Sequence, residues 1–383
     1  MEYRLSDLTV DGRGTYGIAA SAVDYDPRKP TYLRITDIND DGTINFEGLK
    51  SVDDENSFKY VLKENDIVFA RTGASTGRSY FYQKEDGVFV YAGFLIKFSL
   101  DPQKVNPRYL KYYTHSKIYY DWVHSFDSGA TRGNINAKTF GEMLINLPER
   151  KIQDKIVLVM KDLDDKIAVN SRICANLEVQ AQALFKHWFI DFAPFKDGKF
   201  VESELGMIPE GWRVGKLGEI ADFVRGKTIT KGETKEGNIP VVAGGLEPAY
   251  YHNKSNTSSR VVTISGSGAN AGFTRMYFSP VWASDCSYID KESTAFLHTA
   301  FCYLLTNKKK VNALQWGAAQ PHVYAKDINK LPLVIAPSDV LTHFEGFVVS
   351  MFDSIDLLEK ESSRLSTLRD TLLPKLMSGE IKV

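Results

Sequence analysis

Polar loops that contain glycine carry most of the side chains in this sequence that could do chemistry. The stretch Arg71-Thr-Gly-Ala-Ser-Thr-Gly-Arg78 offers two guanidinium groups, three hydroxyls and backbone N–H groups that glycine leaves accessible. Such a set can bind phosphate oxygens and the edges of nucleic-acid bases. An ordinary hairpin loop has a similar composition, so both interpretations stay open for this stretch alone.

Both polar loops of the first half of the chain recur in the second half. Thr72-Gly-Ala-Ser-Thr-Gly77 resembles Ser267-Gly-Ala-Asn-Ala-Gly272, and Gly129-Ala-Thr-Arg-Gly-Asn-Ile-Asn-Ala-Lys138 resembles Gly317-Ala-Ala-Gln-Pro-His-Val-Tyr-Ala-Lys326. Glycines, a lysine and apolar anchors are repeated, whereas the polar side chains between them differ. A loop that is reproduced together with its scaffold belongs to what the module does, so the recurrence favours contact loops.

Several enzyme signatures are nearly present, and each is incomplete. Arg225-Gly-Lys-Thr228 resembles the end of a phosphate-binding loop, but the first glycine of that pattern would fall at Ala221. Asn106-Pro-Arg-Tyr109 lacks the second proline of the adenine methyltransferase motif, and Glu233-Thr-Lys235 has no convincingly placed aspartate of a nuclease signature. The seven histidines show no metal-ligand spacing. We therefore expect no catalytic centre, no metal site and no cofactor.

Length and composition are ordinary for a globular protein. The 383 residues can form two or three cores, and 43% hydrophobic with 25% charged residues is typical. Cys174, Cys286 and Cys302 lack paired spacing, which favours small apolar residues in a reducing compartment. No apolar run approaches the roughly 20 residues of a membrane span, and the N-terminal stretch has no apolar signal core. We therefore expect a cytoplasmic protein.

The charge is nearly balanced, with a formal net value of −1. Residues 1–148 contain 18 Lys and Arg against 20 Asp and Glu, whereas residues 210–335 contain 15 against 10. Neither segment is strongly basic. If the chain binds DNA, local patches or partner subunits must therefore supply the phosphate contacts.

The first globular segment mixes short β-rich runs with turn signals. The residues of Asn39–Gly42 suit a tight turn, and Pro107–Val123 has the pattern of an amphipathic helix with proline near its start. The expected strands are Thr31–Ile35, Asp66–Ala70, Ser79–Tyr82 and Val88–Phe98.

A long helix is expected from Ile152 to Trp188. Its apolar positions alternate in steps of three and four residues, which is the seam of a helix that packs along another helix. No glycine or proline interrupts it, so at about 1.5 Å per residue it would extend roughly 55 Å. Asn170 falls in this seam, where it either fixes the register of the pair or faces solvent. The aromatic residues expected to pack in a core at the helix end are Phe185, Trp188, Phe189 and Phe192.

The partner for this helix is the segment Val340–Met377. A shift of 188 positions superimposes Leu163 on Met351, Ile167 on Ile355 and Trp188 on Leu376. The chain is therefore one unit of domain plus long helix written twice. The expected boundaries are residues 1–149 for the first domain, 150–190 for the first helix, 191–209 for a connector, 210–335 for the second domain, and 336–383 for the second helix and tail.

This plan closely resembles the DNA specificity subunit of type I restriction-modification systems. The most specific parts are the connector Trp188–Trp212, WFIDFAPFKDGKFVESELGMIPEGW, and the C-terminal stretch Leu372–Ile381, LLPKLMSGEI. The resemblance covers the whole chain. One departure is that the first domain begins at Tyr3-Arg4-Leu5 without the Gly211-Trp212 lead-in of the second.

The resemblance implies an α+β fold with two similar target-recognition domains that contain small twisted β-sheets. Two long antiparallel helices would separate them as a coiled-coil spacer and relate them by a pseudo-twofold axis. Members of the family are not catalytic. They recognise a bipartite site in double-stranded DNA, one half per domain, and hold methyltransferase subunits and ATP-dependent restriction subunits, with two methyltransferase copies suiting the repeat.

The candidate DNA contacts are polar or basic residues of the repeated segments. They are Arg34, Arg71, Thr72, Ser75, Thr76, Arg78, Thr131, Arg132, Asn134, Asn136, Lys138, Arg225, Lys227, Ser265, Ser267, Asn270, Gln320, His322 and Lys326. Two other interpretations remain. A chain that methylates or cuts DNA alone would need the motifs found incomplete above. A two-domain helical adaptor that binds proteins without specific DNA recognition agrees with the near-neutral charge.

Overall fold

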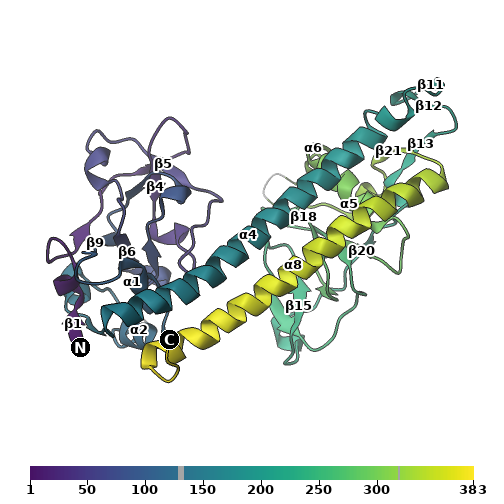
Figure 1. Ribbon diagram of the computed structural model, residues 1–383. Coiled ribbons are helices and arrows are strands. Elements are labelled where there is room, and N and C mark those ends of the chain that lie inside the picture. Colours follow the sequence, from purple (N-terminus) through teal and green to yellow (C-terminus); the bar gives the residue numbers. More distant parts are fainter. Residues whose placement is uncertain (128–132, 318–319) are drawn as a thin grey trace. The chain divides into compact units, whose positions relative to one another are not determined.

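The computed structural model describes residues 1–127, 133–317 and 320–383, which form two compact units (Figure 1). Unit 1 comprises Met1–Ile167 and Ser363–Val383, and unit 2 comprises Ala168–Ser362. The two long helices are α4, Arg150–Phe189, and α8, Ser338–Ser378. Each unit therefore contains a globular part and a portion of both long helices.

Unit 1 is built of short strands and helices. Its strands are β1 (Glu2–Arg4), β2 (Thr15–Tyr16), β3 (Ala22–Val23), β4 (Thr31–Leu33), β5 (Lys50–Val52), β6 (Asp66–Ala70), β7 (Ser79–Phe81), β8 (Phe89–Tyr91), β9 (Leu95–Ser99) and β10 (Leu144–Asn146). Its α-helices besides α4 and α8 are α1 (Pro107–Tyr113), α2 (Lys117–His124) and α3 (Ala137–Gly141). Its 3-10 turns are η1 (Leu5–Leu8), η2 (Ile35–Asp37), η3 (Ser57–Tyr60), η4 (Gly73–Ser75) and η5 (Lys84–Asp86).

Unit 2 repeats the order of the main elements, with an added hairpin at its start and one strand fewer before its central strand. Its strands are β11 (Phe200–Ser203), β12 (Gly206–Pro209), β13 (Arg213–Lys216), β14 (Val224–Arg225), β15 (Ile239–Val242), β16 (Tyr250–His252), β17 (Val261–Ser265), β18 (Thr274–Tyr277), β19 (Trp282–Ala283), β20 (Cys286–Asp290) and β21 (Pro332–Ile335). Its short helices are α5 (Leu297–Thr306), α6 (Lys308–Asn312) and α7 (Ala325–Ile328), with 3-10 turns η6 (Ala193–Phe195), η7 (Leu217–Glu219) and η8 (Lys231–Glu233).

The two units share the topology of the main sheet, whereas the second sheet has four strands in unit 1 and three in unit 2. The main sheet has the order β2-β9-β6-β7 in unit 1 and β14-β20-β17-β18 in unit 2, with antiparallel neighbours throughout. A second small sheet contains one parallel pair in each unit, β4 with β8 and β15 with β19. In unit 1 the first strand β1 pairs with the last strand β10, and in unit 2 β13, the first strand after the β11–β12 hairpin, pairs with the last strand β21. The repeat seen in the sequence is therefore a repeat of strand order and direction.

The central strands β6 and β17 are buried at every residue. Asp66-Ile-Val-Phe-Ala70 and Val261-Val-Thr-Ile-Ser265 are continuous, largely apolar runs of the length typical of a strand covered on both faces. Each lies between two hydrogen-bonded neighbours, so its backbone groups are paired without solvent. These strands are the fixed points from which the candidate loops emerge.

In unit 2, the end of α4 packs against the start of α8 through aromatic side chains. The Phe189 ring meets Phe344 edge-on with 4.8 Å between centroids, and it lies 5.8 Å from Trp212. Phe185 and Phe189 are both buried. The aromatic core expected at this helix end is confirmed for these residues, and it joins the connector to both helices.

Asn170 is fully buried in the helix seam of unit 2. Its Nδ2 donates to the carboxylate of Glu361 at 2.7 Å and to the hydroxyl of Ser362 at 3.2 Å. Farther along α4, Cys174 approaches the Ile355 carbonyl, so the pairing in this unit is antiparallel. Of the two interpretations from the sequence, the structure supports a buried seam residue, which specifies register because a shift would leave these polar groups unpaired.

Unit 1 holds its portions of the two helices together with a half-buried carboxylate. Asp164 of α4 accepts from the Arg369 guanidinium of α8, from Lys111 and from the Tyr112 hydroxyl, each at 3.0 Å. Burial opposes ionisation of Asp164, but the positive Lys111 and Arg369 outweigh it and lower the pKa of this carboxyl. The globular part of unit 1 is thus attached to both helices at one point.

Three local expectations differ from the structure. The helix expected over Pro107–Val123 is broken into α1 and α2, because Ser116 caps α2 by accepting from the Tyr119 N–H and Thr114 bonds back to the Lys111 carbonyl. The run Val88–Phe98 forms two strands around a turn. The connector contains the hairpin β11–β12. The turn at Asn39–Gly42 is confirmed, with Gly42 at φ +74°.

No helix in the described part of the chain is long and apolar enough to cross a membrane.

The buried Glu345 of α8 caps the first turn of α5 in unit 2. Its carboxylate accepts from the His298 N–H at 3.0 Å, the His298 ring at 2.6 Å, the Thr299 N–H at 2.9 Å and the Thr299 hydroxyl at 2.6 Å. Burial opposes ionisation, but the bonds and charge of His298 together with Thr299 outweigh it and lower the pKa of Glu345. This group docks the second globular part onto its helix.

We expect Glu345→Gln to lower the free energy of unfolding at pH 7 by about 2–3 kcal/mol, because a neutral amide cannot accept all four hydrogen bonds. A group with a lowered folded pKa stabilises above its unfolded pKa and loses this effect as pH falls. The difference from the wild type should therefore shrink below pH 4.5, the ordinary pKa of the group. Urea unfolding from pH 7 to pH 3.5 measures it, with the exposed Glu292→Gln as the matched control. A difference that does not change with pH would contradict this role.

Candidate nucleic-acid interface

The glycine loop after each central strand is closed by the same backbone hydrogen bonds in both units. In unit 1 the Gly77 N–H donates to the Ala70 carbonyl at 2.8 Å, and in unit 2 the Gly272 N–H donates to the Ser265 carbonyl at 2.9 Å. Both glycines have positive φ, +86° and +88°, which L side chains rarely adopt. The repeated glycines therefore preserve a loop shape.

The second polar loop lies against the first in both units. The Ile135 N–H donates to the Arg71 carbonyl at 3.0 Å, and the Val323 N–H donates to the Gly266 carbonyl at 3.0 Å. The segments that the sequence singled out separately are thus brought together at the end of each central strand. Of the candidates in this loop, Thr131 and Arg132 lie outside the described residues.

Two of the candidate arginines are bound to carboxylates of their own unit. Arg34 pairs with both oxygens of Asp37, at 2.9 and 2.6 Å, and also donates to the Gly48 carbonyl. Arg78 pairs with Asp40 at 2.6 Å and donates to the Ile38 carbonyl at 3.0 Å. These guanidinium groups hold surface turns in the structure as it stands.

The candidate hydroxyls of the glycine loops have mainly internal roles. Ser75 and Ser265 are buried, and the Ser265 hydroxyl has no hydrogen-bond partner. The Thr76 hydroxyl donates to the carbonyls of Gly73 and Gly133, at 2.8 and 3.1 Å. Thr72 is partly exposed beside them. Thr76 therefore ties the two loops of unit 1 together.

A basic hollow of about 340 Å³ lies beside these loops in unit 1. Arg4, Arg13 and Lys138 line it together with Glu142, whose carboxylate lies 3.9 Å from the Lys138 ammonium. The exposed Asn136 caps α3 by accepting from the Thr139 N–H at 2.9 Å, and Asn134 is exposed two residues before it. Three cations thus lie close to the candidate loops of unit 1, and they suit phosphate oxygens.

Among the candidate arginines that the structure describes, Arg71 differs because aromatic rings hold it. Its guanidinium carbon lies 5.3 Å from the centre of the Tyr16 ring and 6.0 Å from that of Phe94. The Tyr16 hydroxyl in turn accepts from the Ala137 N–H at 3.1 Å, and the Arg71 N–H donates to the Phe94 carbonyl. Among the described residues, none accepts a hydrogen bond from the guanidinium, and its Nε is buried without a partner.

At the position of unit 2 that corresponds to Arg71 and its two rings, the side chains are different. Arg225 precedes Gly226. The Gly226 N–H donates to the carbonyl of the first residue of β20, and the Gly17 N–H donates in the same way to the carbonyl of the first residue of β9. Arg225 lies 3.8 Å from Asp285, which also accepts from the Ser267 hydroxyl. By these backbone bonds, Arg225, Gly266 and Asp285 take the places of Tyr16, Arg71 and Phe94.

Two of the remaining candidates of unit 2, His322 and Lys326, lie beside aromatic side chains. His322 exchanges two backbone hydrogen bonds with the exposed Trp316, and its ring stacks on Tyr324 at 6.1 Å. The Lys326 ammonium lies 5.5 Å from the centre of the Tyr324 ring. Gln320 and Lys227 are exposed and Asn270 is partly exposed. Stacking surfaces and a cation thus occur together here, which suits nucleic-acid bases.

The sequence interpretation missed the partners that orient these groups. Tyr16, Phe94, Asp285 and Trp316 lie outside the polar loops that were compared. The sequence did contain a signal for Tyr16, because Tyr16-Gly17 has a counterpart in the repeat, Arg225-Gly226. The reason for the two glycines is visible only in the structure, where a Cβ at either position would collide with backbone carbonyls. Phe94 has no such signal.

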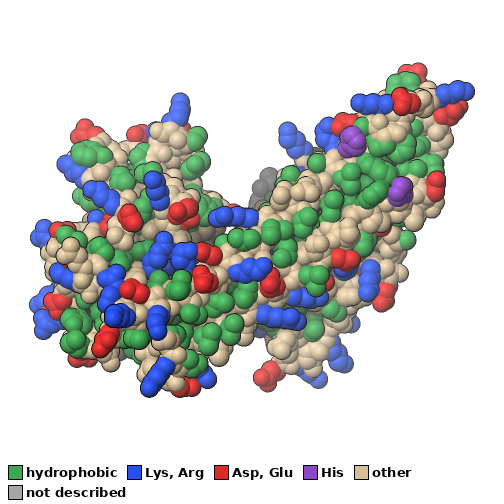
Figure 2. All heavy atoms as spheres, in the orientation of Figure 1, with side chains coloured by type: hydrophobic (Ala, Val, Ile, Leu, Met, Phe, Trp, Pro, Cys, Tyr) green, Lys and Arg blue, Asp and Glu red, His purple; other side chains and the backbone are tan. Residues whose placement is uncertain are grey.

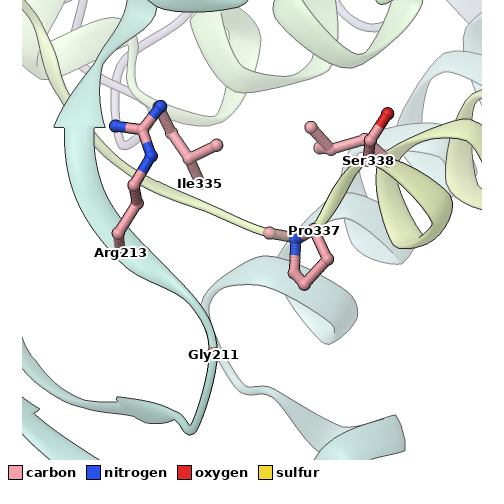
Figure 3. A pocket seen from close by; sticks show the side chains of 7 residues that line it. Gly211, Arg213, Ile335, Pro337 and Ser338 are labelled. Carbon is pink, nitrogen blue, oxygen red and sulfur yellow. The ribbon is translucent and has the colours of Figure 1, made fainter.

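A second hollow, of about 330 Å³, lies beside the first turn of α8 in unit 2 (Figure 3). It is lined by Gly211, Arg213, Ile335, Ala336, Pro337, Ser338 and Leu341. The guanidinium of Arg213 pairs with Glu219 at 2.6 Å, so the one charged residue of the lining is already neutralised. The hollow lies between the connector and the start of α8, and its lining offers no unpaired charged group that could bind a ligand.

The surface is not dominated by one charge. On the face shown in Figure 2, basic and acidic side chains are interspersed over both units. In residues 1–127, 133–317 and 320–383, no group of three or more His, Cys, Asp or Glu residues could hold a metal ion. Burial raises the pKa of the Cys286 thiol to about 12 and also raises that of Cys302, so both behave as apolar core residues.

Two repeated modules, each with polar loops at the end of a buried strand and each attached to two long helices, define a recognition protein built twice on one plan. The chain belongs to the family of the type I restriction modification DNA specificity domain, which matches residues 3–179 and 209–341. The resemblance found in the sequence is therefore confirmed.

Relatives extend over most of the chain. The type I restriction enzyme MjaIX specificity subunit of Methanocaldococcus jannaschii is 28% identical over 72% of this chain and 69% of its own length. The HindI specificity subunit of Haemophilus influenzae is 23% identical over 84% of this chain and 88% of its own. The solved S subunit of the type I restriction-modification system of M. genitalium shares the fold, with 18% identity, a TM-score of 0.52, and coverage of 98% of this chain and 95% of that one.

We expect Gly77→Ala to destabilise unit 1 by about 2–4 kcal/mol, because φ of +86° is unfavourable for alanine and the added Cβ would lie 2.5 Å from the Val123 side chain. Gly73→Ala is the matched control, since φ there is +73° but no atom lies within 4 Å of the new Cβ. It should cost only about 1–2 kcal/mol. Urea unfolding measures both, and equal losses would show that contact with α2 does not hold the loop.

Proposed function

We propose that this chain is the non-catalytic, sequence-specific DNA-recognition subunit of a type I restriction-modification complex, with each unit reading one half of a bipartite site. The observation that carries the proposal is the pair of equivalent loop frames, closed by Gly77 and Gly272, which present different polar side chains. An invariant frame with variable contents suits the reading of two different base sequences. The names of its relatives, specificity subunits, support the same role.

The phosphate contacts of such a site would come from local clusters. Arg4, Arg13 and Lys138 of the basic hollow are candidates in unit 1, and Lys227 and Lys326 are exposed candidates in unit 2. Base edges would be read from the loop ends, where Arg71 lies in unit 1 and Arg225 lies in unit 2. Because the net charge is −1, binding would also depend on cations of partner subunits.

The long helices would set the gap between the half-sites and dock the partner subunits. Each is one unbroken helix, of 40 residues for α4 and 41 for α8. Both also expose apolar residues, which Figure 2 shows along their surfaces and which include Val169, Val179 and Leu357. Apolar side chains on the outside of paired helices suit methyltransferase subunits, of which the repeat would hold two copies, and restriction subunits.

The first experiment is to co-express the chain with its methyltransferase subunit and to read adenine methylation across the host DNA at base resolution. We expect a bipartite motif with a fixed unspecified gap, because two separate units must contact the same duplex. A folded complex that binds S-adenosylmethionine but adds no methylation would contradict the proposal and favour the helical adaptor. Methylation by the chain alone would contradict a non-catalytic role.

The length of the gap between the two half-sites tests the spacing role of the helices independently of base recognition. Four residues inserted in α4 after Arg172, together with four inserted in α8 at the facing residues 359–360, should lengthen the gap by about two base pairs. Four residues add about 6 Å of helix, and successive base pairs are about 3.4 Å apart. The control places the same four residues beside Gly198 in the connector and should leave the gap unchanged. A gap that is unaffected by the helix insertions would exclude the spacing role.

A further inference from the structure

The end of β6 presents a guanidinium group that the protein orients but does not use. Arg71 follows a strand that is buried throughout, and its backbone is fixed on both sides, by the Phe94 carbonyl at 3.1 Å and the Ile135 N–H at 3.0 Å. Tyr16 and Phe94 hold the side chain by cation–π contacts. The other two candidate arginines of unit 1 in the described loops, Arg34 and Arg78, are paired with carboxylates.

The orientation limits which donors of Arg71 can reach a ligand. Nε is buried without a hydrogen-bond partner, which leaves the terminal nitrogens for contact outside the protein. Tyr16 and Phe94 are 42% and 57% exposed, so apolar ring surface flanks this donor pair. A planar donor pair of fixed direction matches a planar acceptor with two neighbouring acceptor atoms.

We propose that Arg71, held by Tyr16 and Phe94, is the specificity-determining residue for one guanine of the half-site read by unit 1. Guanine presents O6 and N7 side by side in the major groove, and arginine can bind both at once. The inference rests on the proposed function and adds the base that is recognised. Phosphate offers two oxygens as well, but it lies in water and does not need the apolar rings that border Arg71.

Comparison with unit 2 supports the role of this position. The backbone bonds of Arg71 recur at Gly266, whose N–H donates to the Asp285 carbonyl at 3.1 Å and whose carbonyl accepts from Val323 at 3.0 Å. The frame is thus kept where the side chains are exchanged. Arg225 and Asp285 bring a donor and an acceptor to the equivalent place, so unit 2 recognises a different base pair there.

The test uses the complete complex with its methyltransferase subunit and compares the methylated motifs of the wild type and Arg71→Gln. We expect Arg71→Gln to accept other bases at one G·C pair of one half-site, while the other half-site and the gap stay unchanged. Phe94→Leu should relax the same position, because it removes a ring that orients Arg71. Arg28→Gln, an exposed arginine paired with Asp26, is the control and should leave the motif unchanged.

A binding measurement with modified DNA covers a variant that methylates too weakly for a motif to be read. Replacing the guanine by 7-deazaguanine removes the N7 acceptor, and it should weaken binding of the wild-type complex about tenfold at one position. The Arg71→Gln complex should show no loss at that position. The unfolding temperature of the variant should fall by only a few degrees, because Arg71 makes no ion pair within the described residues and the change removes only its two cation–π contacts.

Other outcomes overturn the inference in distinct ways. If the Arg71→Gln complex methylated all sites equally weakly and its motif stayed intact, Arg71 would contact a phosphate and not a base. A motif without guanine in either strand of the affected half, or an unchanged motif in Arg71→Gln, would also overturn it. No motif from the wild-type complex would instead contradict the proposed function itself, so the two failures are distinguishable.

Discussion

The hydrogen bonds that close a glycine loop onto the end of a buried strand are the constraint on which the recognition surface depends. In unit 1 the loop returns through Gly77 to Ala70, and in unit 2 it returns through Gly272 to Ser265. Both strands are buried throughout, so the loop ends have little freedom to move. A second loop then pairs with the residue directly after the strand, at Arg71 or Gly266. The backbone that carries the polar side chains is therefore held by the buried strands and the loop hydrogen bonds, and not by anything that these side chains contact.

This arrangement separates stability from specificity. The backbone bonds and positive-φ glycines recur in both units, whereas the side chains at the loop ends differ in size, charge and hydrogen-bonding capacity. Substitution at Arg71 or Arg225 removes no buried apolar contact of the core. These side chains can therefore be exchanged without rebuilding the fold. The cost of this freedom is that each exposed group needs local orientation, which Tyr16 and Phe94 provide for Arg71.

Partly or fully buried polar groups attach each globular part to its helices. Asp164 in unit 1 and Glu345 in unit 2 are carboxylates on the long helices that bind several donors each. Asn170 adds a polar pair within the apolar seam of unit 2. A purely apolar seam would tolerate sliding by a heptad, whereas these groups lose their partners if the helices shift. For a protein whose proposed role includes a fixed spacing, specificity of register matters more than the last increment of stability.

The sequence by itself determined the repeat, the two long helices, the α+β class and the family, because glycine spacing, apolar periodicity and the connector are properties of residue order. It also placed the candidate loops. Only the tertiary structure decided that Arg78 is engaged elsewhere, because its partner Asp40 lies 38 residues away in the chain. The partner of Arg34, Asp37, is a neighbour in the sequence. The break of the helix after Tyr113 is local, since Thr114 and Ser116 bond to backbone groups three residues away. Folding, in contrast, brought Tyr16 and Phe94 to Arg71. Side-chain partners depend on contacts between residues far apart in the chain, which periodicity does not encode.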